Sequence, residues 1–160
     1  MSNKDAVEVF GVIQNHGQSK LQQMKVAKKL FLQFVNTQVH NLEDDTKNLL
    51  HRSAQRAGLV VSDDAPFHFT SLDQISMDCM VLDLWDKYAH WLGMKACYVE
   101  KGNEILYALG SIDNYFSQSK SYFLCDHPER KSPDFKIPHV FQPSIWKVIQ
   151  QNMRRRVAKY

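Results

Sequence analysis

Apolar side chains recur at helical spacing between residues 19 and 42 and predict the clearest helix of the sequence. At 100° per residue these positions fall on one face, while lysine, glutamine and asparagine side chains occupy the other. The apolar face contains Met24, Ala27, Leu30, Phe31, Phe34, Val35 and Leu42. We expect this face to pack against the core.

Two shorter helices are predicted on either side of it. Residues 4–15 carry apolar side chains at helical spacing and are followed by a glycine, a common helix stop. Residues 44–58 have an aspartate, Asp44 or Asp45, as a candidate N-cap and end at Gly58. The first third of the chain is therefore predicted to be helical.

A fourth helical pattern, at residues 71–92, is apolar on almost its whole circumference. It opens with Ser71 followed three residues later by Gln74, the sequence of a capping box. Its narrow polar strip consists of Ser76, Asp83, Asp86, Lys87 and His90. A helix that is apolar on most of its circumference is buried on most of it, so we expect this helix to be the central element.

After this helix the pattern changes towards β-structure. Residues 95–100 and 104–109 are rich in β-prone side chains and flank a Lys-Gly-Asn turn at 101–103. The expected fold class is therefore α+β and predominantly helical. It comprises about five helices and a small antiparallel hairpin or sheet at 95–109, which short strands within 59–69 could join.

The C-terminal third is predicted to contain a helix from residue 110 to about 123, then a proline-rich segment and a last helix. Four of the five prolines lie in residues 126–143, which predicts an extended arm because proline interrupts regular structure. We expect residues 1–125 to form one globular domain. Residues 144–160 should form a basic helix that packs on the same domain, with Ile145, Ile149, Met153 and Val157 along one stripe.

The composition is that of an ordinary globular chain. The 160 residues are 44% hydrophobic and 23% charged, which argues against extensive disorder, a collagen-like repeat or a pure coiled coil. We see neither a signal peptide nor an apolar run long enough to span a membrane. The three cysteines, Cys79, Cys97 and Cys125, form no Cys-x-x-Cys motif, which favours reduced thiols and a cytoplasmic location.

Charge is distributed unevenly behind a net value of +3. Residues 1–60 carry eight basic and five acidic side chains, and residues 61–110 carry three and eight. Residues 111–160 carry nine basic and four acidic side chains, a local charge of +5. The acidic middle either pairs internally with the basic ends or leaves surfaces of opposite sign.

Basic side chains in the C-terminal third alternate with aromatic ones. Such a mixture suits RNA or single-stranded DNA, because cations contact phosphates and aromatic rings stack on bases. The candidate nucleic-acid-binding residues are Arg130, Lys131, Lys136, Lys147, Arg154, Arg155 and Arg156. The simpler alternative is that the aromatic side chains belong to the core and that the arginines form an ordinary basic helix end.

Candidate catalytic chemistry is sparse. Asp83, Asp86 and His90 share one helix face and could act in acid–base chemistry or hold a metal, but a salt-bridged strip is the simpler interpretation. Cys125 and His127 start a Cys/His grouping, with Cys97 and His139, that matches no known zinc spacing. Glycine-rich phosphate loops and the Gly-x-Ser-x-Gly motif are absent from the sequence. We therefore predict no catalytic residue, no metal and no cofactor.

The hypothesis that remains is a non-enzymatic cytoplasmic binding or adaptor protein. It would be an accessory subunit of a larger bacterial or phage-type assembly. The predicted partner-binding residues lie in or next to the arm and are Phe135, Lys136, Phe141 and Trp146. The first alternative is a nucleic-acid-binding protein that uses the basic C-terminal third. The second is a small enzyme with its site around Asp83, Asp86 and His90.

Overall fold

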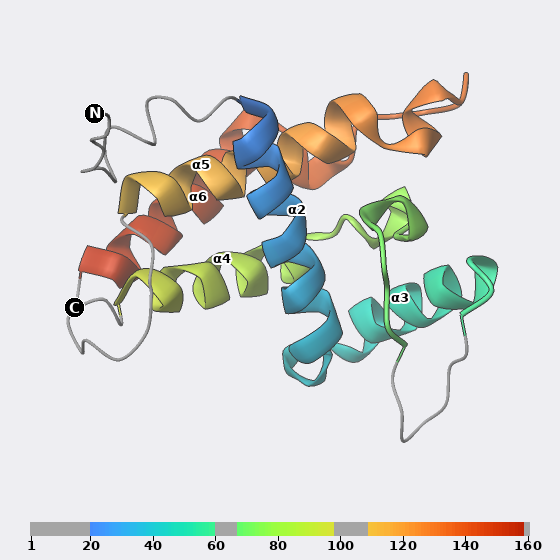
Figure 1. The fold of residues 1–160 in the computed structure, drawn as a ribbon, viewed down its shortest axis with the longest axis horizontal. Coiled ribbons are helices and arrows are strands. Elements are labelled where there is room, and N and C mark those ends of the chain that lie inside the picture. Colours follow the sequence, from blue (N-terminus) through green and yellow to red (C-terminus); the bar gives the residue numbers. More distant parts are fainter. Residues whose placement is uncertain (1–19, 60–66, 98–108, 159–160) are drawn as a thin grey trace, which may run out of the picture.

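The computed structural model describes residues 20–59, 67–97 and 109–158, and within these ranges the chain is helical, without a β-strand (Figure 1). The α-helices are α2 (Lys20–Thr37), α3 (Asp44–Arg56), α4 (Leu82–Cys97), α5 (Leu109–Ser121) and α6 (Pro143–Ala158). Short 3-10 turns lie at Val39–Asn41, Leu72–Gln74, Met77–Cys79, Pro128–Lys131 and His139–Phe141, and a π-helical turn lies at Tyr122–Asp126.

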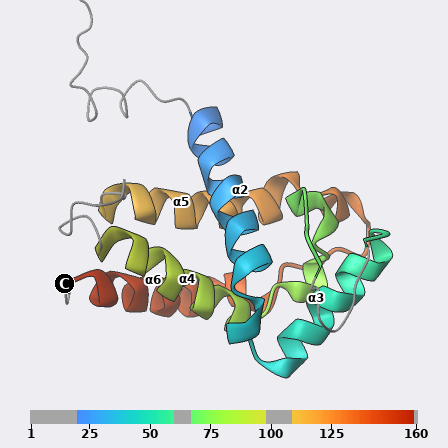
Figure 2. The same ribbon diagram turned by 60° about the horizontal axis from the view of Figure 1, so that its bottom comes forward.

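Helices α4, α5 and α6 run side by side, and α2 crosses them steeply (Figures 1 and 2). The closest pairs are α4 with α6 and α2 with α5. Helix α3 lies beyond the C-terminal end of α2 and packs against the 3-10 turn at Met77–Cys79. Helix α4 therefore lies between α2 and α6, and part of its surface faces solvent between them.

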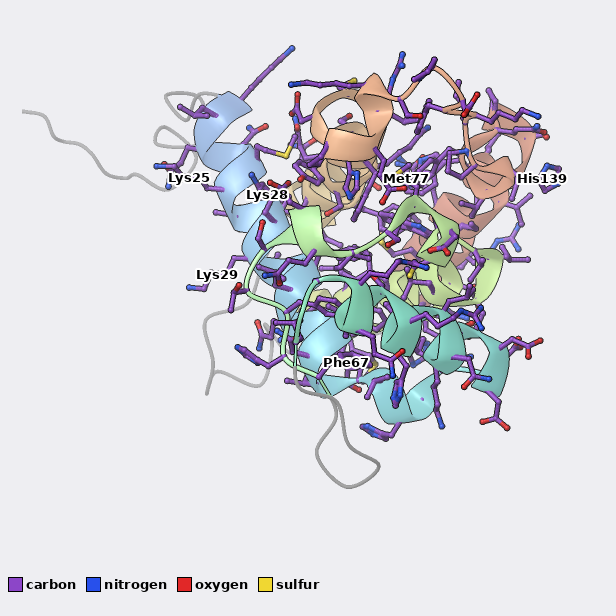
Figure 3. All side chains as sticks on the ribbon, turned by 90° about the vertical axis from the view of Figure 1, so that its right-hand side faces the viewer. Lys25, Lys28, Lys29, Phe67, Met77 and His139 are labelled. Carbon is purple, nitrogen blue, oxygen red and sulfur yellow. The ribbon has the colours of Figure 1, made fainter. Side chains whose placement is uncertain are left out.

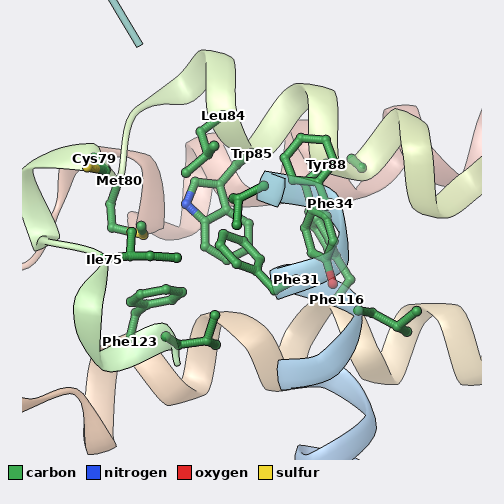
Figure 4. Close-up of a cluster of buried hydrophobic side chains, with 14 of the residues drawn as sticks. Phe31, Phe34, Ile75, Cys79, Met80, Leu84, Trp85, Tyr88, Phe116 and Phe123 are labelled. Atoms are coloured by element: carbon green, nitrogen blue, oxygen red, sulfur yellow. The ribbon is translucent and has the colours of Figure 1, made fainter. Parts of the chain in front are cut away.

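Aromatic side chains fill the centre of this arrangement (Figure 4). The ring of Trp85 on α4 is fully buried, with its centroid 5.0 Å from that of Phe31 on α2 and 5.9 Å from that of Phe116 on α5. The rings of Phe141 and Trp146 each lie 5.3 Å from it, and Trp146 also stacks on Phe116 at 4.5 Å. These separations are typical of aromatic contacts, so one indole joins α2, α5, α6 and the turn before α6.

The helices predicted at 19–42, 44–58 and the C-terminus are observed. The first is α2, followed by the 3-10 turn at Val39–Asn41. Helix α3 has Glu43 as its N-cap residue rather than Asp44 or Asp45. It ends in a Schellman motif: Gly58 has a φ of 78°, and the N–H of Leu59 donates to the carbonyl of Ala54 at 2.9 Å. The predicted helix at 4–15 lies outside the described residues.

The prediction of a helix at 71–92 is wrong for its first half, because α4 begins only at Leu82. The capping residues do bind the backbone: Ser71 Oγ accepts from the N–H of Asp73 at 3.2 Å, and Gln74 Oε1 accepts from the N–H of Thr70 at 2.9 Å. They cap a single 3-10 turn, Leu72–Gln74, and not an α-helix.

Hydrogen bonds from other elements explain this interruption. Ser53 on α3 donates its hydroxyl to the carbonyl of Gln74 and accepts from the N–H of Ser76, both at 2.8 Å. His127 Nε2 bonds to the carbonyl of Ile75 at 2.7 Å. These backbone groups would otherwise enter the ladder of an α-helix, and here distant side chains satisfy them instead.

The predicted hairpin at 95–109 is not seen. Helix α4 continues through Cys97 and α5 begins at Leu109, so both ends of the predicted hairpin are helical, while 98–108 lies outside the described residues. Of the predicted strands in 59–69, the described residues 59 and 67–69 are not strand, and 60–66 lie outside. Gly93 lies inside α4 and disfavours the helix by only about 1 kcal/mol relative to alanine. The packing of α4 against α6 outweighs this cost, so the helix continues past Gly93.

The proline-rich segment 126–143 follows an irregular course that is attached to the core at both ends. His127 is buried at its start, and Val140 and Phe141 are buried near its end. Between them, residues 128–134 are exposed. None of the described helices combines the length and the apolar composition that crossing a lipid bilayer requires.

We predict that Phe31→Ala lowers the free energy of unfolding by about 3–5 kcal/mol, because it leaves a cavity among four neighbouring rings. Leu21→Ala is the matched control on the same helix and should change it by less than about 0.5 kcal/mol, since Leu21 is 69% exposed. Urea titration followed by circular dichroism measures both. Equal losses in the two variants would contradict the assignment of this core.

Candidate binding site on the outer face of α4

The polar strip of α4 lies between two hollows of the surface. Asp83, Asp86, Lys87 and His90 form this strip. One hollow, the α4–α6 groove, lies between α4 and the first turns of α6, and the other, the α2–α4 cleft, lies between α4 and the C-terminal end of α2. Asp86 and Lys87 line both, so they form the ridge that separates the two hollows.

Asp83 has a structural role at one end of the strip. Its Oδ2 accepts from the N–H of Glu43 and from the hydroxyl of Thr46, both at 2.8 Å, and its Oδ1 accepts from Lys87 Nζ at 2.6 Å. Burial opposes its charged form, but the bonds from Lys87, Glu43 and Thr46 together outweigh it and lower the pKa of the carboxyl below its ordinary value. Asp83 thereby supplies a negative charge to the N-terminus of α3, where the helix dipole favours one.

The three residues predicted to share an enzymatic site are therefore not equivalent in the structure. Both oxygens of Asp83 are engaged by groups of α3 and by Lys87, whereas Asp86 and His90 line the α2–α4 cleft. Within the described ranges no three acidic, histidine or cysteine side chains are placed to hold a metal ion. What the strip brings together is a pair of polar side chains at the edge of a cleft.

In the predicted Cys/His grouping, His127 is buried, whereas Cys125 and His139 are exposed. Cys79 is buried, and burial raises the pKa of its thiol to about 12, so the thiol stays protonated. His127 has one ring nitrogen bonded to the carbonyl of Ile75, and the other accepts from the N–H of Glu129 at 3.1 Å. This buried imidazole joins the backbone at Ile75 to the arm, and both of its ring nitrogens are hydrogen-bonded.

The α4–α6 groove has a volume of about 610 Å³ and an apolar floor. Leu82 at the start of α4 is 56% exposed and Val148 on α6 is 55% exposed, and both line it. Ile145 and Ile149 complete the apolar lining. Single exposed aliphatic side chains are common on protein surfaces, but clusters of them are uncommon. Such clusters often mark contact sites.

The polar lining of this groove is mainly acidic. Glu43 and Asp86 carry negative charges, while the negative charge of Asp83 is balanced by Lys87. The charged lining thus has a net charge of −2 at neutral pH. The groove therefore combines an apolar floor with a negative rim.

The predicted partner-binding residues divide into two pairs. Phe141 and Trp146 are buried in the aromatic core, in ring contact with Trp85. Phe135 is half-buried under the guanidinium of Arg130, which lies 4.9 Å from its ring centroid. Lys136 is exposed. Only the second pair lies where a partner could reach it without disturbing the core.

The predicted nucleic-acid-binding residues do not share one surface. Arg130, Lys131 and Lys136 lie on the segment after α5, at one end of the molecule, and Arg154, Arg155 and Arg156 lie in the last turns of α6, at the opposite end (Figures 1 and 2). Lys147 lies near the start of α6 and is exposed. Arg154 is also engaged, because its guanidinium pairs with Asp113 on α5.

Sequence reasoning missed two surfaces that the structure reveals. Helix α2 contains four lysines and no acidic residue, and Lys25, Lys28 and Lys29 lie along one side of the molecule (Figure 3). The absence of acidic residues over 18 positions was a usable signal. The second surface is the α4–α6 groove, for which the signal was Val148, an aliphatic side chain outside the apolar stripe of its helix.

Comparison with known proteins adds no relative to this description. No family model, no curated protein and no solved structure matches the chain.

We predict that Asp83→Asn lowers the free energy of unfolding by about 1.5–3 kcal/mol, because it removes charge-assisted hydrogen bonds. Asp86→Asn, one turn along the same helix, is the matched control and should change it by less than about 0.5 kcal/mol. Urea titration at pH 7 measures both values. If Asp83→Asn left the free energy of unfolding unchanged, this would contradict the role of the carboxylate in joining α4 to α3.

We also predict that the stabilisation from Asp83 is lost in acid. Because folding lowers the pKa of this carboxyl, its contribution is complete above the unfolded value of about 3.9 and disappears as the pH falls through the folded value below that. Urea titrations of wild type and Asp83→Asn between pH 7 and pH 2.5 should therefore converge at the acid end. A difference in stability that stays constant over this range would count against the prediction.

Proposed function

We propose that the protein is a binding or adaptor subunit that holds a segment of a partner protein in the α4–α6 groove. The observation that carries the proposal is the pair of exposed aliphatic side chains, Leu82 and Val148, which come from two helices and line one groove. The occupant that fits is an amphipathic segment with apolar side chains towards the floor and basic residues along its edges.

The apolar part of this argument is energetic. Complete burial of a leucine or valine side chain stabilises by roughly 1.5–3 kcal/mol, and more than half of each side chain is still exposed here. Covering both would therefore contribute on the order of 2 kcal/mol. That is enough to make them central contacts of an interface but not to determine the whole affinity.

Charge supports the choice of a basic segment. At the rim of the groove, Glu43 and Asp86 form no ion pair with another residue of the described ranges. A segment with acidic flanks would meet like charges there, whereas lysine or arginine flanks would meet opposite ones and be drawn in. Complementary charge thus selects among apolar segments that the floor alone would accept equally.

This proposal moves the predicted partner contact away from the core aromatic residues. Phe141 and Trp146 stabilise the fold, and the groove beside them is the surface that a partner would use. Phe135 and Lys136 in the arm stay candidates for a second contact. The cytoplasmic setting and the bacterial or phage-type assembly expected from the sequence also stay predictions.

The test is a binding measurement with two synthetic helical peptides, each with a leucine stripe, one with lysine flanks and one with glutamate flanks. Fluorescence anisotropy should show that the lysine-flanked peptide binds wild type and that Leu82→Glu/Val148→Glu weakens binding roughly tenfold or more, because each glutamate replaces an apolar contact. The glutamate-flanked peptide should bind more weakly than the lysine-flanked one, because its negative charges repel those of Glu43 and Asp86 at the rim.

The chain supplies matched controls. Leu21→Glu changes a still more exposed aliphatic residue, on α2, and should leave peptide binding unchanged. Lys136→Glu/Ile137→Glu changes the exposed arm and reports whether the arm contributes. Equal binding by wild type and the groove variant, or loss of binding only in the arm variant, would overturn the groove as the partner site.

A further inference from the structure

The α2–α4 cleft, on the other side of the Asp86–Lys87 ridge, has different chemistry from the groove. It has a volume of about 640 Å³, within the range of small-molecule sites. Its lining comes from α4 between Asp86 and Lys95, the end of α2, the 3-10 turn that follows α2 and one residue of α6. The residues are Phe34, Gln38, Asn41, Asp86, Lys87, His90, Trp91, Met94, Lys95 and Arg156.

One wall of the cleft is aromatic. Trp91 is partly buried, and its ring centroid lies 5.7 Å from that of Phe34 and 6.2 Å from that of Tyr88, which support it from the core side. The ammonium of Lys95 lies 4.3 Å from the Trp91 centroid. Trp91 is therefore a fixed indole at the edge of the core, with a cation held against it.

The charged lining is mainly basic. Lys95 and Arg156 are positive, the charge of Lys87 is balanced by Asp83, and Asp86 is the one acidic side chain among the lining residues described. Within the described chain, Lys95 is in no ion pair, and its ammonium contacts the neutral indole ring. The cleft therefore favours an anion, in contrast with the negative rim of the α4–α6 groove.

Neutral hydrogen-bonding groups lie beside these charges. Partial burial lowers the pKa of the His90 imidazole, the charge of Arg156 lowers it further, and Asp86 opposes both. The neutral ring offers one donor and one acceptor. Across the cleft, Asn41 Nδ2 donates to Gln38 Oε1 at 2.9 Å, which orients this amide pair. Such groups can read the edge of a heterocyclic base.

We propose that the α2–α4 cleft binds a nucleotide, with its base on Trp91 and its phosphate between Lys95 and Arg156. The aromatic wall can stack on the base, and the adjacent cations can bind the phosphate. The neutral polar groups can hydrogen-bond to the edge of the base. The ligand is either a free mononucleotide or one nucleotide of a single strand, since both present the same chemistry.

Lys95 has to move for the base to stack, and the balance of interactions favours that movement. A cation over an exposed indole is held more weakly than a base stacked on the same ring. The displaced ammonium stays within reach of the phosphate, with which it forms a charge-assisted hydrogen bond. Binding thus exchanges one weak contact for two stronger ones.

The experiment is calorimetric titration of the full chain at low ionic strength with AMP, adenosine, inorganic phosphate and a short single-stranded oligoadenylate. AMP should bind at least roughly tenfold more tightly than adenosine or phosphate, because each of these lacks one of the two contacts. Similar affinity for AMP and the oligonucleotide identifies a free nucleotide as the ligand. Much tighter binding of the oligonucleotide, with a steep salt dependence, identifies a strand.

Variants separate the cleft from general charge attraction. Lys95→Gln and Trp91→Leu should each weaken AMP binding roughly tenfold, while Lys25→Gln, which removes one exposed positive charge on α2, should leave it unchanged. Circular dichroism melting of each variant confirms that it is folded, and Lys95→Gln retains the core even if Trp91→Leu does not. The groove variant Leu82→Glu/Val148→Glu should bind AMP normally, so the two proposals fail independently.

Three results would overturn the inference. The first is no binding of AMP or the oligonucleotide at millimolar concentration. The second is binding of inorganic phosphate as tight as that of AMP, which would mean that the indole contributes nothing. The third is equal loss of AMP binding in Lys95→Gln and Lys25→Gln, which would mean that only the overall charge attracts the ligand.

Discussion

The buried indole of Trp85 is the contact on which the arrangement of helices depends. It touches rings from α2, α5 and α6, so three helices that are distant in sequence are positioned against α4 by one side chain. Its Nε1–H has no hydrogen-bond partner in the described structure. An unsatisfied buried donor costs about 1–3 kcal/mol, and the apolar contacts of this ring outweigh it. Both hollows beside α4 exist because this packing fixes α4 between its neighbours.

A second constraint acts at the start of α4. The carboxylate of Asp83 joins the first turn of α4 to the N-terminus of α3 and holds Lys87 in an ion pair. This pairing has a functional consequence, because it neutralises the one basic residue on the ridge. The charges that remain are negative on the groove side and positive on the cleft side. The structural carboxylate thereby prevents Lys87 from offsetting the negative charges of the groove.

The two hollows divide binding between different kinds of ligand. The α4–α6 groove offers exposed aliphatic side chains and a negative rim, which suit a basic amphipathic protein segment. The α2–α4 cleft offers an indole and cations, which suit an anion with a planar ring. Because Asp86 and Lys87 are the only described residues that line both, one can be altered without the other. A subunit of this design can hold a partner segment and a small ligand on adjacent surfaces of one helix.

Local patterns in the sequence determined α2, α3 and α6, because their apolar faces and the glycine stop at Gly58 act within a few residues. Only the tertiary structure decided where α4 begins, since Ser53 and His127 take backbone bonds that a longer helix would need. It also decided which residues line the same hollow: Leu82 with Val148, and Trp91 with Arg156. A binding site between helices depends on their packing, and helical periodicity reports only which face of each helix is apolar.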